Sequence, residues 1–180
     1  MKRFALFVFV LAAVSVSAFA QDELAKDVLA APANMREGAT VIKWKPDFTY
    51  DVLKQGTNNI VCYDKSGFPE QPAFMVECTS SKGNLDREAQ NLKAEAGGDK
   101  KATQAMLEAE EKDGTRVKPV FGSVWYHAMG ADKDHVRMHM TIAVPGATTQ
   151  SLGLPDNGKE GGVWIMNAGT TTAHLMTPGE

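Results

Sequence analysis

One long helical segment lies between two groups of short β-favouring segments, and this order limits the folds open to the chain. Within residues 84–113, apolar residues recur at helical spacing: Leu85, Ala89, Leu92 and Ala96. Asn84 or Asp86 is a candidate cap for the start of this segment. Gly97-Gly98 interrupts it, and Asp99 is the expected cap of a second helix that ends near residue 113. The sequence therefore predicts two helices in the middle of a β-rich chain.

Eight segments around these helices have the composition of strands and are bounded by turn residues. They cover residues 39–44, 50–55, 59–63, 73–78, 120–129, 135–144, 163–167 and 171–177. Most connections between them are short, which antiparallel pairing allows. We therefore expect an α+β fold, with a mainly antiparallel sheet of six to eight strands and a central helical insertion. Residues 21–180 are expected to form a single domain.

The first twenty residues have the three parts of a secretory signal peptide. Lys2 and Arg3 give a positive start, residues 4–14 are uniformly apolar, and Ala18-Phe19-Ala20 is an A-x-A cleavage pattern. We expect cleavage between Ala20 and Gln21, which leaves an exported chain, periplasmic or secreted. A membrane anchor is the alternative, but the apolar run is short for a span of ~30 Å.

The two cysteines, Cys62 and Cys78, enclose fifteen residues and lie in two neighbouring β-favouring segments. Loop-forming residues, among them Pro69 and Pro72, separate these segments. Export to an oxidising compartment favours a disulfide between the two cysteines. A thiol pair that binds metal or carries electrons is the alternative, but its usual spacing is C-x-x-C. We therefore predict a structural Cys62–Cys78 disulfide.

Charge and hydropathy exclude two classes of partner. The chain of 180 residues carries 19 basic and 22 acidic side chains, for a net charge of −3. A nucleic-acid-binding protein needs a basic face to displace counterions from phosphates, so we expect no nucleic-acid partner. After the signal peptide, no segment is apolar for long enough to span a membrane. A protein or small-molecule partner remains, and the sequence does not identify it.

All four histidines and five of the nine methionines follow residue 126. Two H-x-M strings occur among them, His127-Ala128-Met129 and His174-Leu175-Met176. Residues two apart in a strand face the same side, ~7 Å apart, so each string presents an imidazole and a thioether together. Soft thioether sulfur selects Cu(I), and imidazole binds copper in either oxidation state. We therefore predict a copper site of His127, Met129, His174 and Met176, on adjacent strands and on one face of the sheet. Core packing of these residues is the alternative.

The string Arg137-Met138-His139-Met140 has a different interpretation. Alternation in the strand places Met138 and Met140 on an apolar face, where we expect them in the core. His135, Arg137 and His139 then share the opposite face. Arg137 stands between the two histidines, and its positive charge disfavours a metal cation there. We expect His135 and His139 on a polar surface that faces solvent or a substrate.

Two resemblances concern these residues. His127, Met138 after ten intervening residues, and the pair His174 and Met176 are similar to the His/Met motif of PCuAC-type periplasmic copper chaperones. In this chain thirty-five residues separate Met138 from His174, which is more than in that family. The resemblance implies copper as the ligand.

The stretch from about Met35 to the end of the chain resembles a family of exported bacterial proteins of unassigned function. Members begin near an R-E-G-A-T-V segment, here residues 36–41, and close with G-T-x-x-A-H-[IL]-M-x-P, here residues 169–178. This resemblance implies an exported single domain and no particular activity.

Three classes of function are consistent with the sequence. We favour an exported, non-catalytic binding protein that handles copper through His and Met ligands. The first alternative is a small exported hydrolase in which a histidine is a general base oriented by Asp132, Asp134 or Asp156. Ser123 or Ser151 is then the candidate nucleophile, although neither lies in a G-x-S-x-G elbow. The second alternative is a structural or partner-binding protein of the cell envelope.

Overall fold

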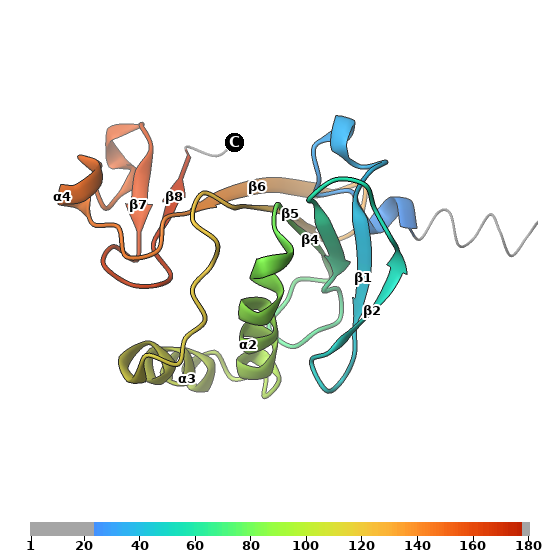
Figure 1. The fold of residues 1–180 in the computed structure, drawn as a ribbon, viewed down its shortest axis with the longest axis horizontal. Helices are drawn as coiled ribbons and strands as arrows, with labels where there is room; N and C mark the ends of the chain where they lie inside the picture. The colour runs from blue at the N-terminus through green and yellow to red at the C-terminus, as the bar shows by residue number, and fades with distance from the viewer. Residues whose placement is uncertain (1–23, 178–180) are drawn as a thin grey trace, which may run out of the picture.

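The structure is a computed structural model that describes residues 24–177, and these form one eight-stranded sheet with two main helices (Figure 1). The strands are β1 (Thr40–Trp44), β2 (Tyr50–Lys54), β3 (Val61–Asp64), β4 (Phe74–Thr79), β5 (Val124–Gly130), β6 (Val136–Ala143), β7 (Trp164–Met166) and β8 (His174–Met176). Each strand lies within one residue of a segment that the sequence predicted. The α+β class and the number of strands are therefore confirmed.

The strands follow the order β2-β1-β3-β4-β5-β6-β8-β7 across the sheet. Neighbours pair antiparallel, except that β1 and β3 run parallel. The exception arises because β2 turns back along the outer side of β1, and the chain then returns to start β3 on the inner side. The sheet is thus mixed, and the expected antiparallel pairing describes most of it.

The helical insertion lies between β4 and β5, as predicted, and contains α2 (Leu85–Glu95) and α3 (Lys100–Asp113). Asp99 caps α3, since its side chain accepts hydrogen bonds from the backbone N–H groups of Lys101 and Ala102. Asn84 does not cap α2 with its side chain. Its amide instead donates to the hydroxyls of Thr79 and Ser123, which ties the start of the helix to the sheet. Asn84 therefore occupies the N-cap position, as expected, but makes no capping hydrogen bond.

Shorter helices complete the described chain. They are a helical turn at residues 24–27, α4 (Thr149–Leu152) and the 3-10 turns η1 (Ala33–Met35), η2 (Lys82–Asn84) and η3 (Gly158–Glu160). α4 and η3 lie in the connection between β6 and β7, which the sequence predicted as a long loop. Within residues 24–177, no helix combines the length and the apolar character needed to cross a membrane.

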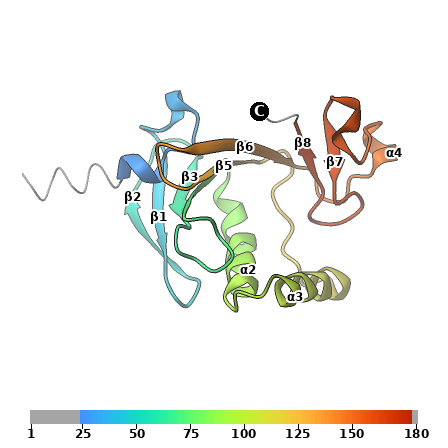
Figure 2. The ribbon, with the colours of Figure 1, turned by 180° about the vertical axis from the view of Figure 1, so that it is seen from behind.

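An apolar cluster packs against each face of the sheet formed by β1, β3 and β4. On the helix side, Leu85 and Leu92 of α2 pack in one cluster with Ile42 and Tyr63 of β1 and β3. On the other side, residues 24–31 and their neighbours cover Val76 and the two cysteines. Both helices of the insertion lie on the same side of the sheet when it is seen from the front and from behind (Figures 1 and 2). The cavity described below opens on that side.

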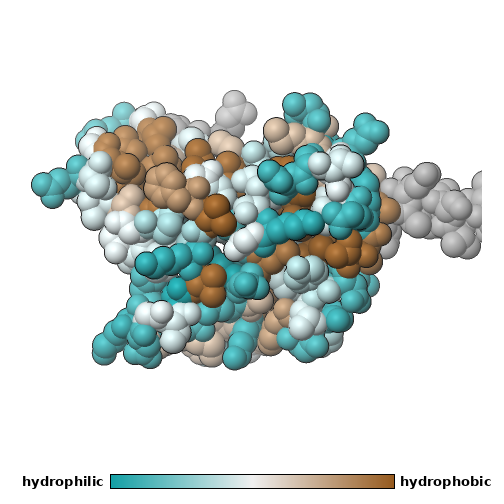
Figure 3. Space-filling model, in the orientation of Figure 1, coloured by the Kyte–Doolittle hydropathy of each residue, from teal (hydrophilic) through white to brown (hydrophobic). Residues whose placement is uncertain are grey.

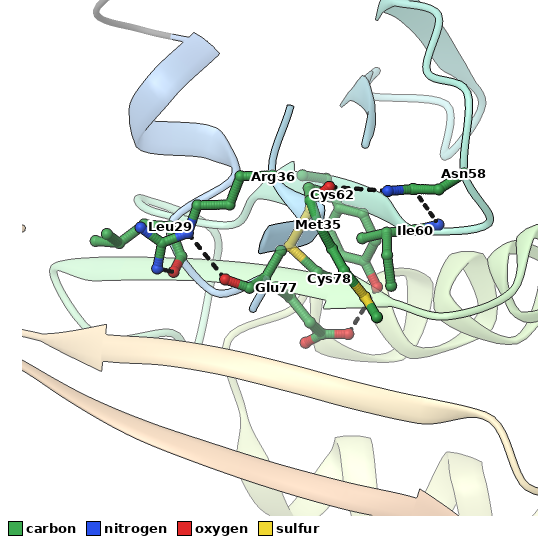
Figure 4. Close-up of a disulfide and its surroundings, with 10 residues drawn as sticks. Leu29, Met35, Arg36, Asn58, Ile60, Cys62, Glu77 and Cys78 are labelled. Atoms are coloured by element: carbon green, nitrogen blue, oxygen red, sulfur yellow. Dashed lines mark hydrogen bonds between the residues drawn. A yellow bond between two sulfur atoms is a disulfide. The ribbon is translucent and has the colours of Figure 1, made fainter. Parts of the chain in front are cut away.

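The disulfide joins Cys62 of β3 to Cys78 of β4, which are directly opposite each other in the antiparallel ladder (Figure 4). Both cysteines are fully buried. Nearby, the guanidinium of Arg36 donates to the carbonyls of Leu29 and Ala31, which holds the N-terminal segment against this part of the sheet. The predicted disulfide is confirmed, and its sulfurs lie on the face of the sheet away from the helices.

The face of β6 that points away from the helices is less covered than expected. Met138 is 48% exposed, so its assignment to the core is wrong, although it does lie on the face opposite His139. Further exposed apolar side chains, Leu152, Val163 and Met166, belong to the region of α4 and β7. Hydrophobic residues gather there in the space-filling view, whereas hydrophilic residues dominate over α3 (Figure 3).

Candidate functional site

A cavity of about 730 Å³ lies between the sheet and the helical insertion. One wall is formed by β4, β5, β6 and β8, the opposite wall by α2 and α3, and one end by the chain between β7 and β8. Most of the side chains that line it are polar or charged. Its volume is typical of sites for small molecules, so it is the candidate functional site.

A row of three side chains crosses the sheet wall of this cavity. Glu77 of β4 is directly opposite His127 of β5, and His127 is directly opposite His139 of β6. Nδ1 of His127 is buried and lies 3.3 Å from Oε2 of Glu77, without a well-aligned hydrogen bond. The rings of His127 and His139 have centroids 5.8 Å apart and a mutual tilt of 30°. Antiparallel pairing of three consecutive strands creates this row, since opposite residues face the same side.

Glu77 is almost inaccessible, in a strand whose six residues are all buried. The hydroxyl of Tyr63 donates a hydrogen bond of 2.6 Å to Oε1 of Glu77. Burial disfavours the charged form of Glu77, but Lys65 at 3.8 Å and His127 outweigh burial and lower the pKa of Glu77 to about 2. Glu77 is therefore an ionised carboxylate beside His127 at neutral pH.

Lys65 lies among three carboxylates beneath the cavity. Its Nζ is 2.6 Å from Oε1 of Glu88, 3.7 Å from Oε2 of Glu95 and 3.8 Å from Oε2 of Glu77. Burial opposes the charge of Lys65, but these carboxylates outweigh burial and raise its pKa. Burial and the charge of Glu77 raise the pKa of Glu88 to about 7, although Lys65 acts against this rise. Lys65 is therefore a cation that Glu77 and Glu88 share, and it lies closer to Glu88.

Two arginines on the opposite wall connect α2 to its neighbours. Arg87 donates to the hydroxyl of Thr172 at 2.7 Å and to the carbonyl of Val117. Arg116 donates to the side chains of Gln90 and Asn91, which both belong to α2. These contacts fix the segment after α3 and the loop before β8 against α2. The shape of the cavity is thus held by buried polar contacts.

His174 lines the cavity from β8. Its Nδ1 is 2.7 Å from the carbonyl oxygen of Thr172, and because a carbonyl only accepts, Nδ1 carries the proton. Nε2 is then the unprotonated nitrogen of the ring. Burial lowers the pKa of His174, as it does for His139, where the nearby charges of His127 and Arg137 act in the same direction.

Three of the four predicted copper ligands, His127, Met129 and His174, line this cavity, and Met176 does not line it. The expectation of adjacent strands is wrong, because β6 lies between β5 and β8. His174 is opposite Ala143, which is four residues along β6 from His139. At ~3.3 Å per residue, this register separates the two positions by ~13 Å along the strand.

The residues proposed for a hydrolase lie elsewhere or have structural contacts. Asp132 is on an exposed turn, where its carboxylate is 2.9 Å from Nδ1 of His135. The hydroxyl of Ser123 donates to the carbonyl of Val120, and Ser151 forms a capping box with Thr148. None of these residues lines the cavity; nor do Asp134 and Asp156. The carboxylate beside His127 is that of Glu77.

Sequence reasoning did not select the buried charged residues of the cavity. They are Lys65, Glu77, Arg87, Glu88 and Arg116. A signal was present for Glu77, because it interrupts the apolar run of residues 73–78. A charged residue in a strand that is otherwise apolar needs a buried partner, and that partner is often functional.

Comparison of the chain with models of protein families, with curated proteins and with solved structures finds no match. The two resemblances based on short motifs therefore remain expectations. Among residues 24–177, no group of three or more His, Cys, Asp or Glu side chains is arranged to hold a metal ion.

Proposed function

We propose that this is an exported, non-catalytic protein that binds copper(I) on the sheet wall of its cavity. The observation that carries the proposal is the shared position of His127, Met129 and His139 on the lining of one cavity. Imidazole and thioether groups together form a soft ligand set, which prefers Cu(I) to magnesium or calcium.

The environment of His127 supports the proposal. Its Nδ1 lies 3.3 Å from the carboxylate of Glu77. Histidines that bind metals commonly donate from the second ring nitrogen to a carboxylate or a carbonyl, which leaves the first nitrogen unprotonated. Nε2 of His127 is then the atom that binds an ion.

Export is the second part of the proposal, and the Cys62–Cys78 disulfide supports it, since disulfides persist mainly outside the cytosol. The predicted signal peptide and cleavage site lie outside the described residues. Mass spectrometry of the protein recovered from the periplasm or the medium tests both features. We expect a chain that begins at Gln21 and is lighter by two hydrogen atoms than its reduced form. Protein that is found only in the cytosol contradicts export, a chain that keeps residues 1–20 contradicts the cleavage site, and free thiols contradict the disulfide.

Copper binding is tested by titration of the purified exported chain with Cu(I) against a chromophoric Cu(I) chelator. The ion is supplied as its acetonitrile complex without a thiol reductant, because reduction of the disulfide would create two thiolates that bind Cu(I) themselves. A thiol assay on the same sample is the control. We expect one equivalent of tightly bound copper. A chain that leaves all copper with the chelator contradicts the proposal.

The contact between Glu77 and His127 also supports a second candidate, a hydrolase. An imidazole oriented by a buried carboxylate is a suitable general base for the activation of water. The test is turnover of a panel of p-nitrophenyl esters by the metal-free protein. Turnover that is lost in His127→Ala and kept in His135→Ala supports the hydrolase, and absence of turnover in the wild type leaves copper binding as the proposal.

A further inference from the structure

We infer that the copper(I) site is built on the cross-strand pair His127 and His139, with Met129 as the third ligand, and that His174 and Met176 stay outside it. The inference rests on the proposed function and specifies its ligands. It departs from the pairing of two H-x-M strings that the sequence suggested. The reason is the register of the sheet.

His127 and His139 are directly opposite each other on β5 and β6, so both side chains leave the sheet on the same side. Their ring centroids are 5.8 Å apart. Two nitrogens that bind one ion, each at ~2 Å, lie at most ~4 Å from each other. Small rotations of the two rings bring their nitrogens to this distance, without movement of either strand.

Met129 is the thioether closest in register to this pair. It lies two residues beyond His127 on the same face of β5 and also lines the cavity. Its side chain is long and flexible, which lets the sulfur move to an ion held by the two imidazoles. Its Sδ is now 3.8 Å from Nη2 of Arg137, which is the residue opposite Met129 on β6. Arg137 therefore competes with an ion for this sulfur.

The register of the sheet displaces His174 from these ligands along the strands. Its position is four residues, or ~13 Å, beyond that of His139 in the direction of the strand. Its ring is also held in place by the hydrogen bond to Thr172. Met176 follows on β8, opposite Thr141, and does not line the cavity.

Glu77 completes the site as a positioning residue. Its carboxylate lies 3.3 Å from Nδ1 of His127 and is fixed from the other side by Tyr63 and Lys65. A small rotation of the imidazole converts this contact into an N–H to carboxylate hydrogen bond. That bond leaves Nε2 of His127 unprotonated and supplies a negative charge next to the bound cation.

The inference is tested by the same Cu(I) titration on single variants of the exported chain. Loss of a partner that only orients a ligand costs about 10–100-fold in metal affinity, so we expect His127→Ala and His139→Ala each to cost at least about 100-fold. Met129→Leu, which keeps the volume of the side chain, should cost less. His174→Ala and His135→Ala are the controls and should leave the affinity within about twofold. Thermal unfolding of each variant checks that the fold is kept.

Arg137→Gln should change the copper affinity in the opposite direction. This change removes the cation beside the site and releases the sulfur of Met129, so copper should bind more tightly than to the wild type. A general loss of stability cannot produce that gain. Unchanged or weaker binding in this variant contradicts the role of Met129.

A measurement on the wild type does not depend on the folding of any variant. Cu(I) is diamagnetic, so ¹⁵N NMR of the histidine rings can follow the binding directly. We expect the Nε2 signals of His127 and His139 to shift with one equivalent of copper and those of His135 and His174 to stay in place. Tight binding that instead shifts His174, or is lost in His174→Ala, overturns the inference and leaves the proposed function standing. A wild-type chain that binds no copper overturns the proposed function itself.

Discussion

Nζ of Lys65 lies 2.6 Å from Oε1 of Glu88, and the side chains of both residues are almost inaccessible to solvent. An ion pair at the same distance, between Lys26 and Asp64, is about one third exposed on each side. The two pairs have the same Nζ–oxygen distance and different surroundings. The cost of breaking each pair therefore measures the effect of burial.

We predict that Lys65→Met destabilises the fold far more than Lys26→Met. Removal of Lys65 takes away the cation nearest to Glu88 in a buried cluster of carboxylates, which costs about 3 kcal/mol or more. Removal of Lys26 breaks a partly exposed pair, worth about 1 kcal/mol or less. The free energies of unfolding are obtained from urea denaturation at neutral pH. Equal losses in the two variants would show that the buried cluster has no special role in stability.

Glu88 should make the stability depend on pH. Its pKa is raised from 4.5 to about 7, because burial and the charge of Glu77 outweigh the opposing effect of Lys65. Between these two pH values, Glu88 is protonated to a greater extent in the folded state than in the unfolded state. The contribution of Glu88 to the free energy of unfolding therefore falls as the pH rises through this window, by at most about 3 kcal/mol.

The test of this prediction compares the wild type with Glu88→Gln in urea denaturation from pH 4.5 to pH 8. The amide keeps the shape of the side chain and does not titrate, so the slope in this window should be reduced in the variant. The lowered pKa of Glu77 acts below this window, since its contribution is lost only as the pH falls below about 4.5. Parallel curves for the two proteins would contradict the assignment of the raised pKa to Glu88.

Most of the fold was predictable because its signals are local. The turn residues around β1 to β4, the Gly97-Gly98 break and the capping Asp99 each act within a few residues, and the structure agrees with them. The parallel pairing of β1 with β3 was not predictable in the same way. It depends on which side of β1 the returning chain takes, and no local pattern of residues records that choice.

The site was predictable only in part, because it depends on register between distant strands. Alternation correctly assigned His127 and Met129 to one face, and His139 to the face opposite Met138. It could not show that His139 is directly opposite His127, whereas His174 is displaced along the sheet. In the sequence, the positive charge of Arg137, two positions before His139, argues against His139 as a metal ligand. In the structure, the guanidinium of Arg137 instead contacts Met129.

The disulfide should contribute to the stability of the fold and not to the binding of copper. Cys62 and Cys78 are 16 residues apart, and a closed loop of this size stabilises by about 3 kcal/mol in the chain-entropy model. Both side chains lie on the face of the sheet away from the cavity. We therefore expect the double variant Cys62→Ala with Cys78→Ala to unfold at a lower temperature and to bind Cu(I) with unchanged affinity. Loss of copper binding in a folded double variant would show that the two faces are coupled.

Gly56 is required by a close approach of two backbone segments. It follows β2 and lies against the start of β1, where its N–H donates to Oγ1 of Thr40. A Cβ atom at this position would lie 2.3 Å from the carbonyl oxygen of Gly38 and 2.4 Å from the backbone nitrogen of Thr40. Neither atom can move without a shift of the strand, so Gly56→Ala should cost about 2 kcal/mol or more.

Gly97 is the matched control for this change. A Cβ atom there would meet no heavy atom within 4 Å. Gly97→Ala should therefore leave the stability unchanged or raise it by up to about 1 kcal/mol, since alanine has fewer conformations in the unfolded chain. Urea denaturation of the two variants measures the difference between them. If Gly56→Ala is as stable as Gly97→Ala, the turn after β2 is loose enough to accept a side chain, and the close packing of this turn against β1 does not fix the register of that edge of the sheet.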